Sequence, residues 1–407
     1  MTMVGSLLVL VLLVSVALSH PLSSNYGQDP EVNYGPIELI TSKGYPAETH
    51  TVITVDGYVL EMHRIPGPKG TMHQDEKRPV FFLQHGLLCS STNWLTNLAN
   101  ESLAYLLADA GFDVWMGNVR GNTYSKLHTH LKPDEKAFWD FTYDEHAAID
   151  LPAMVNYVLD TSKQSDLFYV GHSQGTVMGF AGFTINQTLA KQIKTFFALA
   201  PVTTLSHIQG LFHVLANPLI YPELEFLLEH IGTGEFFGSS DIIKFLGKDV
   251  CIPQFHLIDG ICEDVLFLIC GFNPDNINIT RLPVYYTHTP AGTSVKNLIH
   301  FAQGAHNGKF AMYDYESKAK NMKAYGTPTP PSYNVTELNV PTALFTGGND
   351  WLADPTDVNA SIPLLNTTGH VFYRKHIVQY DHLDFIWGLD SASVVYNDII
   401  NIAKTML

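Results

Sequence analysis

The chain is poor in cysteine and in basic residues. Its 407 residues include only four cysteines, and 23 Lys and Arg stand against 39 Asp and Glu, so the formal net charge is −16 at pH 7. Nucleic-acid binding calls for a basic face, which such a balance does not predict, and we therefore expect no nucleic-acid partner. Electrostatic adhesion to anionic lipid is disfavoured for the same reason, whereas hydrophobic contact with a neutral lipid surface is not.

Beyond the N-terminus, hydrophobic runs that approach membrane-spanning length are also missing. The apolar run at residues 5–18 is too short to cross a bilayer comfortably, and the small residues Ala17 and Ser19 follow the pattern of a signal-peptide cleavage site. No Lys or Arg precedes this run, so an uncleaved anchor is the alternative. We expect residues 1–19 to be a signal peptide and the mature chain to have no transmembrane segment. Such a chain is secreted, with delivery to a lysosome as a second destination.

Metal-binding spacings, internal repeats and low-complexity tracts are missing as well. His128 and His130 form a His-x-His pair, but no carboxylates or cysteines accompany them at a matching spacing, and we interpret the pair as structural. We expect no metal and no cofactor. With 46% hydrophobic residues the chain can bury a sizeable core.

The most informative motif present is GHSQG at residues 171–175, with Ser173 at its centre. An apolar, strand-like run precedes it at 167–170, and a helix of small and apolar residues follows it from 176. Glycines two residues on either side of a serine allow the sharp strand-to-helix turn that exposes a nucleophilic hydroxyl. The context predicts an acyl-transfer enzyme with Ser173 as its nucleophile.

An acid and a base follow in the chain order of an α/β-hydrolase. Asp350 follows the apolar run 340–346, at the strand edge where catalytic groups gather in parallel sheets, and His382 follows the short run 375–380. In this hypothesis His382 is the general base and Asp350 orients it. Asp354 is the rival acid, although Pro355 suggests that it begins a turn or helix. His376 is the rival base, although it falls inside the expected strand.

Two backbone N–H groups are needed to stabilise the oxyanion. The amide after the nucleophile, that of Gln174, is one candidate. The other is the amide of Leu87, because residues 85–88 form a loop after the apolar strand 80–84 and Gly86 allows a close backbone approach. Asp381 and Asp384 flank His382 too closely to orient its ring, and we expect them to be structural.

Strands alternate with helical stretches along most of the chain. A hairpin is expected at 51–62 around Asp56 and Gly57, and then strands at 79–84, 112–116, 166–170 and 195–200 alternate with helices near 101–110, 144–159 and 174–187. This order predicts an α/β fold with a mostly parallel central sheet and helices on both faces. The next core strand begins only near Val340. We therefore divide the mature chain into a core at 20–202, a largely helical cap or lid insertion at 203–335, and the rest of the core at 336–407.

Five segments resemble the acid lipase family of α/β-hydrolases, which includes the gastric and lysosomal acid lipases. The similarity runs from about Tyr34 to about Asn397, and it is carried by LQHGLL (83–88), GNVRGN (117–122), FWDF (138–141), GHSQG (171–175) and DHLDF (381–385). By this resemblance, Ser173, Asp350 and His382 match the family's triad. Leu87 and Gln174 match its oxyanion donors, and the implied activity is hydrolysis of triacylglycerols or cholesteryl esters.

The remaining predictions concern secretion and the cap. Sequence alone leaves three full pairings open for the four cysteines. The spacing of Cys251 and Cys262 resembles the family's cap disulfide, which would leave Cys270 free, and Cys89 is expected to be a packed thiol. Six Asn-x-Ser/Thr sequons are candidate glycosylation sites: Asn100, Asn186, Asn278, Asn334, Asn359 and Asn366.

The sequence thus predicts a secreted, glycosylated serine lipase that meets its neutral lipid substrate at a lipid–water interface. The long apolar runs at 208–220 and 265–269 favour a lid over an acyl-chain groove, although they can equally form the cap's own core. A soluble esterase for short-chain esters is one alternative. A non-catalytic lipid-binding or storage protein is the other, and the complete triad argues against it.

Overall fold

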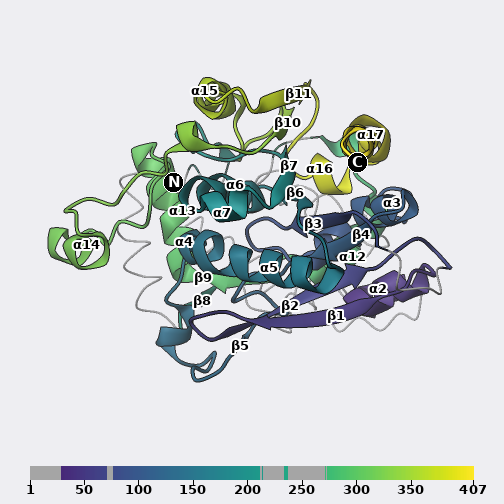
Figure 1. Cartoon of the computed structure of the whole chain (residues 1–407), viewed down its shortest axis with the longest axis horizontal. Coiled ribbons are helices and arrows are strands. Elements are labelled where there is room, and N and C mark those ends of the chain that lie inside the picture. The colour runs from purple at the N-terminus through teal and green to yellow at the C-terminus, as the bar shows by residue number, and fades with distance from the viewer. Residues whose placement is uncertain (1–28, 71–76, 211–212, 214–232, 237–270, 272) are drawn as a thin grey trace, which may run out of the picture.

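The computed structural model describes residues 29–70, 77–210, 213, 233–236, 271 and 273–407 (Figure 1). The expected signal peptide and three of the cysteines, Cys251, Cys262 and Cys270, lie outside the described residues. Most of the apolar runs 208–220 and 265–269 lie outside them as well. The predictions made for these segments stay predictions.

One large sheet organises the described part of the chain. Its strands lie in the order β1-β2-β4-β3-β6-β7-β10-β11, and β5 pairs with β2 beside this row. The bounds are β1 (Glu48–Ile53), β2 (Tyr58–Ile65), β3 (Val80–Gln84), β4 (Asp113–Met116), β5 (Leu127–His128), β6 (Leu167–His172), β7 (Ile193–Leu199), β10 (Thr342–Gly347) and β11 (Val371–Ile377). From β4 to β11 all pairings are parallel, whereas β1, β2 and β5 pair in antiparallel fashion. A mostly parallel sheet is therefore confirmed.

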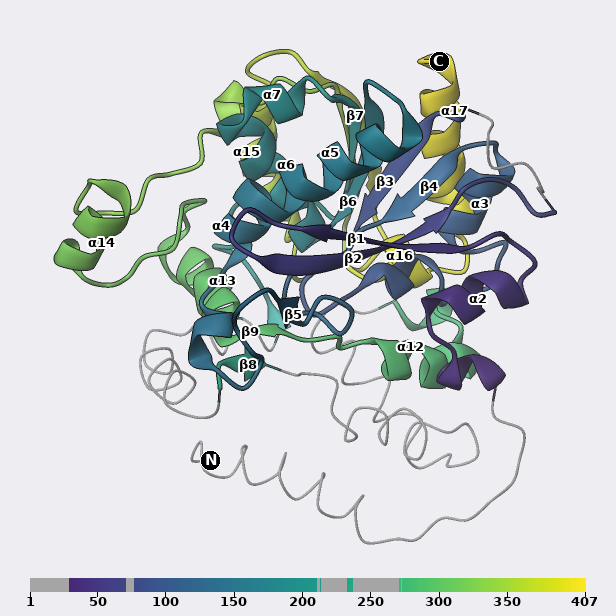
Figure 2. The same ribbon diagram turned by 60° about the horizontal axis from the view of Figure 1, so that its bottom comes forward.

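Helices cover both faces of this sheet, as expected of a parallel sheet (Figure 2). Helices α5 and α6 pack together on one face, and α3 and α17 lie on the other. The longer helices are α2 (Pro36–Ser42), α3 (Leu103–Asp109), α5 (Leu151–Ser162), α6 (Gln174–Ile185), α12 (Leu282–His288), α13 (Val295–Asn307), α14 (Lys318–Tyr325), α15 (Pro355–Leu365) and α17 (Asn397–Thr405). The described helices also include the short α4 (Tyr143–Glu145), α7 (Gln187–Ala190) and α16 (Asp384–Trp387).

Single turns and two π-helical stretches complete the helical part. The 3₁₀ turns are Pro30–Asn33, Ser91–Trp94, Lys136–Trp139, Pro274–Asn276, Ile279–Arg281 and Val335–Glu337. The π-helical stretches are His146–Asp150 and Ala392–Tyr396, which lead directly into α5 and α17. None of the helices in the described part of the chain is long and apolar enough to span a bilayer.

The centre of the sheet is buried because its strands are almost uniformly apolar. Every residue of β3, β4 and β6 is buried, and Phe81 of β3 stacks on Phe168 of β6 with ring centroids 4.9 Å apart. Burying one such side chain stabilises the fold by roughly 1.5–3 kcal/mol. Strands covered on both faces give uninterrupted hydrophobic runs, which is why the sequence predicted their positions well.

The last strand was predicted in the wrong place. The expected strand at 375–380 is in fact β11 at Val371–Ile377, and residues 378–380 form the turn that follows. β11 is an edge strand whose residues alternate between partly buried and exposed until Ile377, so it lacks the apolar run that marks the central strands. The prediction that His382 follows a strand is unaffected.

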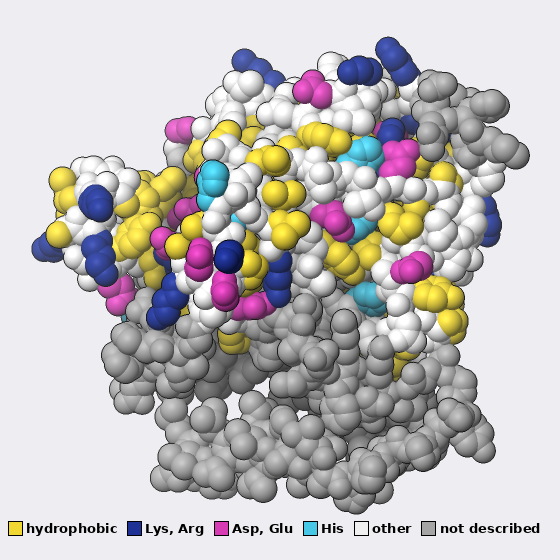
Figure 3. All heavy atoms as spheres, turned by 90° about the horizontal axis from the view of Figure 1, so that it is seen from below, with side chains coloured by type: hydrophobic (Ala, Val, Ile, Leu, Met, Phe, Trp, Pro, Cys, Tyr) yellow, Lys and Arg dark blue, Asp and Glu magenta, His cyan; other side chains and the backbone are white. Residues whose placement is uncertain are grey.

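Residues 200–341 separate β7 from β10, which are neighbours in the sheet, and none of the described residues in this stretch belongs to the sheet. In this stretch α12, α13 and the two-stranded pair of β8 (Glu235–Phe236) and β9 (Thr293–Ser294) gather below the sheet in Figure 2, and α14 stands apart from it. On the described part of the face shown in Figure 3, hydrophobic side chains are interspersed with acidic, basic and histidine side chains. The boundaries of the expected cap at 203–335 stay a prediction.

Candidate active site

Ser173 lies at a strained turn between β6 and α6. Its backbone has φ 54° and ψ −119°, a conformation that non-glycine residues rarely adopt and that marks functional turns. The flanking glycines make the turn possible, because a Cβ on Gly171 would collide with the backbone of Gly175, and one on Gly175 with the carbonyl oxygen of Gln84. The expected strand–turn–helix elbow is therefore present, and Ser173 is partly exposed at its tip.

Asp350 and His382 are brought together from two different loops. His382 Nδ1 lies 2.9 and 3.0 Å from the two carboxylate oxygens of Asp350, and both residues are buried. Oδ1 of Asp350 also accepts hydrogen bonds from the backbone N–H groups of Leu352 (2.9 Å) and Ala353 (2.8 Å). A carboxylate can only accept hydrogen bonds, so Nδ1 of His382 carries the hydrogen. Nε2 is then left free to accept a proton.

The rival acid and the rival base have other positions. Asp354 is the N-cap of α15, where its side chain accepts from the backbone N–H of Thr356 (2.7 Å) and from Gln209 Nε2 (2.7 Å). His376 lies in β11, exposed, with Nδ1 3.0 Å from the hydroxyl of Thr346. Neither is hydrogen-bonded to the other members of the expected triad.

His172, the residue before Ser173, ties the turn to the His382 loop. Its Nε2 donates to the backbone carbonyl oxygen of His382 over 2.9 Å, and the two rings lie 4.9 Å apart. Burial lowers the pKa of His172 to about 3, so its ring stays neutral at ordinary pH. Sequence reasoning did not assign this residue a role, although it lies inside the GHSQG motif.

The two expected oxyanion donors belong to segments that adjoin Ser173: Gln174 follows it in the chain, and Leu87 follows Gly86, which lies close to it. Within the described residues, no backbone carbonyl accepts from the N–H of Leu87 or Gln174. Gly86 brings the first loop close, because a Cβ placed on it would lie 2.9 Å from Cβ of Ser173. His85 steadies this loop: its Nδ1 lies 2.8 Å from the carbonyl oxygen of Gly86. Burial lowers the pKa of His85 to about 4, which keeps its ring neutral.

The side chain of Gln174 is held by residues far away in the chain. Asn297 of α13 donates to Oε1 of Gln174 over 2.8 Å, and Nε2 of Gln174 lies 3.3 Å from His146 Nδ1. All three side chains are buried. The sequence gives no signal for the contact between Gln174 and Asn297, which joins a segment outside the sheet to the residue after the nucleophile.

An ion-pair cluster supports the GNVRGN loop beside the site. Arg120 is buried and contacts Asp150 through Nη2 (2.6 Å) and Nε (2.8 Å), and its Nη1 lies 2.6 Å from Asp56. Its guanidinium also lies over the ring of Tyr58 at 4.0 Å. Asn122 of the same loop lies 3.2 Å from His85 Nε2, so the cluster is connected to the oxyanion loop.

The other predicted positions are surface or packing residues. Cys89 is a buried free thiol, as expected, and burial raises its pKa to about 12. Among the sequons, Asn186 and Asn278 are partly buried and the others are exposed: Asn100, Asn334, Asn359 and Asn366. Their glycosylation stays a prediction.

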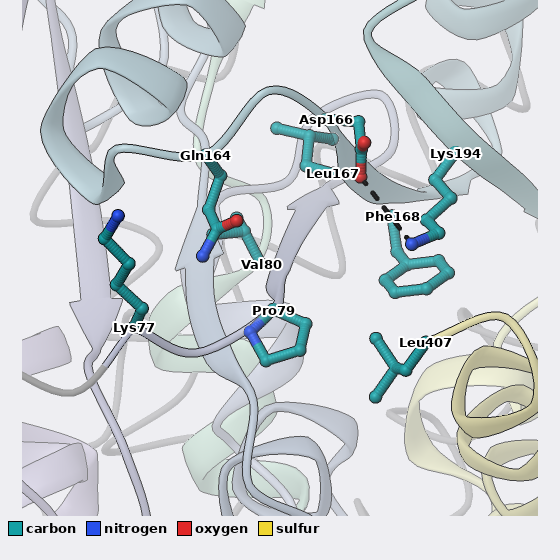
Figure 4. A pocket seen from close by; sticks show the side chains of 9 residues that line it. All are labelled: Lys77, Pro79, Val80, Gln164, Asp166, Leu167, Phe168, Lys194 and Leu407. Atoms are coloured by element: carbon teal, nitrogen blue, oxygen red, sulfur yellow. Dashed lines mark ion pairs between the residues drawn. The ribbon is translucent and has the colours of Figure 1, made fainter.

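A small pocket lies at the N-terminal ends of the central strands (Figure 4). Its volume is about 250 Å³, and Val80, Leu167 and Lys194, which line it, stand at the starts of β3, β6 and β7. Lys194 lies 3.9 Å from Asp166 there. Because Ser173 follows the opposite end of β6, this pocket is remote from the candidate site.

Family models agree with the fold that carries this site. Residues 36–98 match the partial alpha/beta-hydrolase lipase region, and residues 79–208 match the alpha/beta hydrolase fold. Among solved structures, a putative lipase from Sulfolobus solfataricus superposes with a TM-score of 0.59 at 13% identity, covering 89% of this chain and 94% of that one. At this identity the likeness shows the fold alone.

Curated relatives are much more similar. The chain is 46% identical to human gastric triacylglycerol lipase, with 91% of each chain covered, and 46% identical to human lysosomal acid lipase/cholesteryl ester hydrolase, with 92% of each covered. It is 42% identical to mouse lipase member M, over 97% of this chain and 92% of that one. The compartments named for the first two, stomach and lysosome, agree with the expected secreted or lysosomal location. The chain is a lipase that belongs to the gastric and lysosomal acid lipase family of α/β-hydrolases.

Proposed function

We propose that the protein is a secreted serine lipase that hydrolyses carboxylic esters of neutral lipids through an acyl-enzyme on Ser173. The observation that carries this proposal is the strained turn at Ser173, which His172 ties to the backbone of His382, together with the hydrogen bond between His382 and Asp350. The positive φ of Ser173, with Gly86, Gly171 and Gly175 packed closely around the turn, has no evident packing role. It does present a hydroxyl on a turn that His172 joins to the loop of His382.

In the acylation step the Ser173 hydroxyl attacks the ester carbonyl carbon and His382 Nε2 takes its proton. The negative charge that develops on the carbonyl oxygen is stabilised by the N–H groups of Leu87 and Gln174. Asp350 stabilises the imidazolium that forms. His382 then gives the proton to the leaving alcohol as the carbon–oxygen bond breaks.

Deacylation follows the same route with water as the nucleophile. His382 takes a proton from water, the hydroxide attacks the acyl-enzyme, and the proton returns to Ser173 as the fatty acid leaves. Each step needs His382 to alternate between neutral and charged forms. The buried Asp350 carboxylate, with two backbone N–H donors that hold it in place, is suited to support both.

The proposed substrates are triacylglycerols, with cholesteryl esters as a second class, met at a lipid–water interface. The names of the relatives refer to both ester classes, and the net charge of −16 favours contact with a neutral lipid surface over adhesion to an anionic one. The alternative is a soluble esterase for short-chain esters. A lipase and an esterase share the same catalytic residues, so only the physical state of the substrate separates them.

The test compares emulsified long-chain triacylglycerol with a dissolved short-chain ester, for the wild type and Ser173→Ala. We expect the wild type to prefer the emulsion and the variant to lose activity on both substrates. Wild-type activity on the dissolved ester alone would favour the esterase. A Ser173→Ala variant as active as the wild type would rule out the serine mechanism.

A further inference from the structure

Residues 271 and 273–277, here called the strap, run between the loops that carry Asp350 and His382. Gly271 has φ +117°, and a Cβ on it would collide with the carbonyl oxygen of Asn349 and lie 2.9 Å from Cβ of Asp381. Asn349 precedes Asp350, and Asp381 precedes His382. A glycine at 271 therefore lets the chain pass between the neighbours of the candidate acid and base.

Two asparagine side chains of the strap bind one buried carboxylate. Asn276 Nδ2 donates to Oδ1 of Asp384 over 2.8 Å, and Asn273 Nδ2 donates to Oδ2 over 2.8 Å. The same Oδ2 accepts from the backbone N–H of Asp381 over 2.7 Å. Asn276 and Asp384 are buried, so these hydrogen bonds are shielded from water and costly to leave unmade.

Asp384 thereby fixes the backbone on both sides of His382. Asp381 completes the arrangement, because its Oδ1 accepts from the backbone N–H groups of Leu383 (2.8 Å) and Asp384 (3.0 Å). The backbone of the strap is also bound here: the carbonyl oxygen of Asn276 accepts from the N–H of Leu389 over 2.8 Å. The loop carrying His382 thus closes on itself and is held to the strap.

We infer that Asn276 and Asn273 are positioning residues for His382, acting through Asp384. This inference rests on the proposed role of His382 as the base. Asp350 aligns the ring of His382, His172 holds its carbonyl oxygen, and the strap sets the path of the backbone between them. Because proton transfer depends on sub-ångström placement, loosening this arrangement slows the chemical step without changing how substrate binds.

The test exchanges donor and acceptor between Asp384 and Asn276. In Asp384→Asn, the new amide places a donor against the donor of Asn276, and we expect kcat on a dissolved ester to fall roughly 10- to 100-fold with KM unchanged. The rate at which a phosphonate ester labels Ser173 should fall in parallel. Adding Asn276→Asp restores a donor–acceptor pair, and the double variant should recover most of the lost kcat.

Asp314→Asn is the matched control, because Asp314 accepts from the buried Asn321 Nδ2 over 2.9 Å in the α14 region, away from the site. It should lower the melting temperature and leave kcat unchanged. A folded Asp384→Asn with wild-type kcat, or a double variant that stays slow, overturns the inference. If Asp384→Asn does not fold, the double variant decides alone: folding with near wild-type kcat supports the inference, and any other result overturns it.

The proposed function and the strap can fail separately. An active Ser173→Ala contradicts the serine mechanism whatever the Asp384 variants do. An inactive Ser173→Ala together with a fully active Asp384→Asn contradicts the strap alone.

Discussion

Nε2 of His172 donates a hydrogen bond to the backbone carbonyl oxygen of His382 over 2.9 Å. The residue before the candidate nucleophile therefore holds the backbone of the candidate base directly. A carbonyl oxygen can only accept, so Nε2 of His172 must carry its hydrogen. Burial lowers the pKa of this histidine to about 3, so the donating ring stays neutral above that pH.

Gly86→Ala should damage catalysis more than stability. The added Cβ would lie 2.9 Å from Cβ of Ser173, so the loop carrying Leu87 must move away from the oxyanion. Losing one donor typically lowers kcat by about 10²–10³. Steady-state kinetics on a dissolved ester measure this loss. Gly304→Ala is the control, since a Cβ there lies 3.7 Å from the nearest atom, and equal kcat values in the two variants would contradict the prediction.

Asp350→Ala and Asp354→Ala should separate orientation of the base from helix capping. Without Asp350 the imidazole loses the partner that fixes its tautomer, and kcat should fall by about 10⁴. Asp354 only caps α15 and binds Gln209, so its loss should lower the free energy of unfolding by about 1 kcal/mol and leave kcat near the wild-type value. Kinetics and urea unfolding of both variants check this, and the reverse pattern would exchange the two roles.

The stability of the protein should depend on pH through His300. Burial lowers the pKa of His300 to about 3, while an unfolded histidine titrates near 6.5. Below about pH 6.5 the unfolded state binds a proton that the folded state does not, so this histidine lowers stability by up to about 1.4 kcal/mol per pH unit until about pH 3. His300→Gln removes this penalty. Its stability relative to the wild type should therefore rise as the pH falls.

Urea unfolding at pH 4.5, 5.5 and 7 measures this difference. Asp144, whose Oδ1 lies 3.9 Å from His300 Nδ1, acts in the opposite direction, because burial raises its pKa to about 6 and the folded state takes up its proton first. Asp144 is present in both proteins, so the comparison isolates the histidine. A stability difference that is the same at all three pH values would contradict the assignment.

The mature protein should begin at His20. Cleavage after Ser19 removes the apolar run 5–18, and N-terminal sequencing of the protein recovered from the medium of secreting cells detects it. Glycosidase treatment of the same sample should lower its mass, with glycans found at the exposed Asn100, Asn334, Asn359 and Asn366. A chain that keeps Met1 and stays with the membrane fraction would instead support the uncleaved anchor.

The sequence predicted the local structure around the candidate site where local patterns determine it. The glycines around Ser173 specify a turn, and the apolar runs before Asp350 and His85 mark buried strands whose ends meet at one edge of the sheet. The edge strand β11 was misplaced because its alternating residues lack such a run. Local patterns were therefore reliable for the buried central strands and less reliable for the outermost strand, β11.

Contacts between distant residues could not be predicted in this way. Asn297 and Gln174, or Asn276 and Asp384, are more than 100 positions apart, and each is an ordinary polar residue in its own segment. The contribution of these contacts depends on burial, because a hydrogen bond matters most where water cannot replace it. In these two pairs, that burial arises where described residues between β7 and β10 pack against distant parts of the chain.

The most direct test of the central claim is covalent labelling by a phosphonate ester that releases a coloured alcohol. We expect one equivalent of alcohol per active molecule, a single adduct on the peptide that contains Ser173, and parallel loss of lipase activity. Ser173→Ala should release none. An adduct on another residue, or full lipase activity after Ser173 is labelled, would contradict the assignment of Ser173 as the nucleophile.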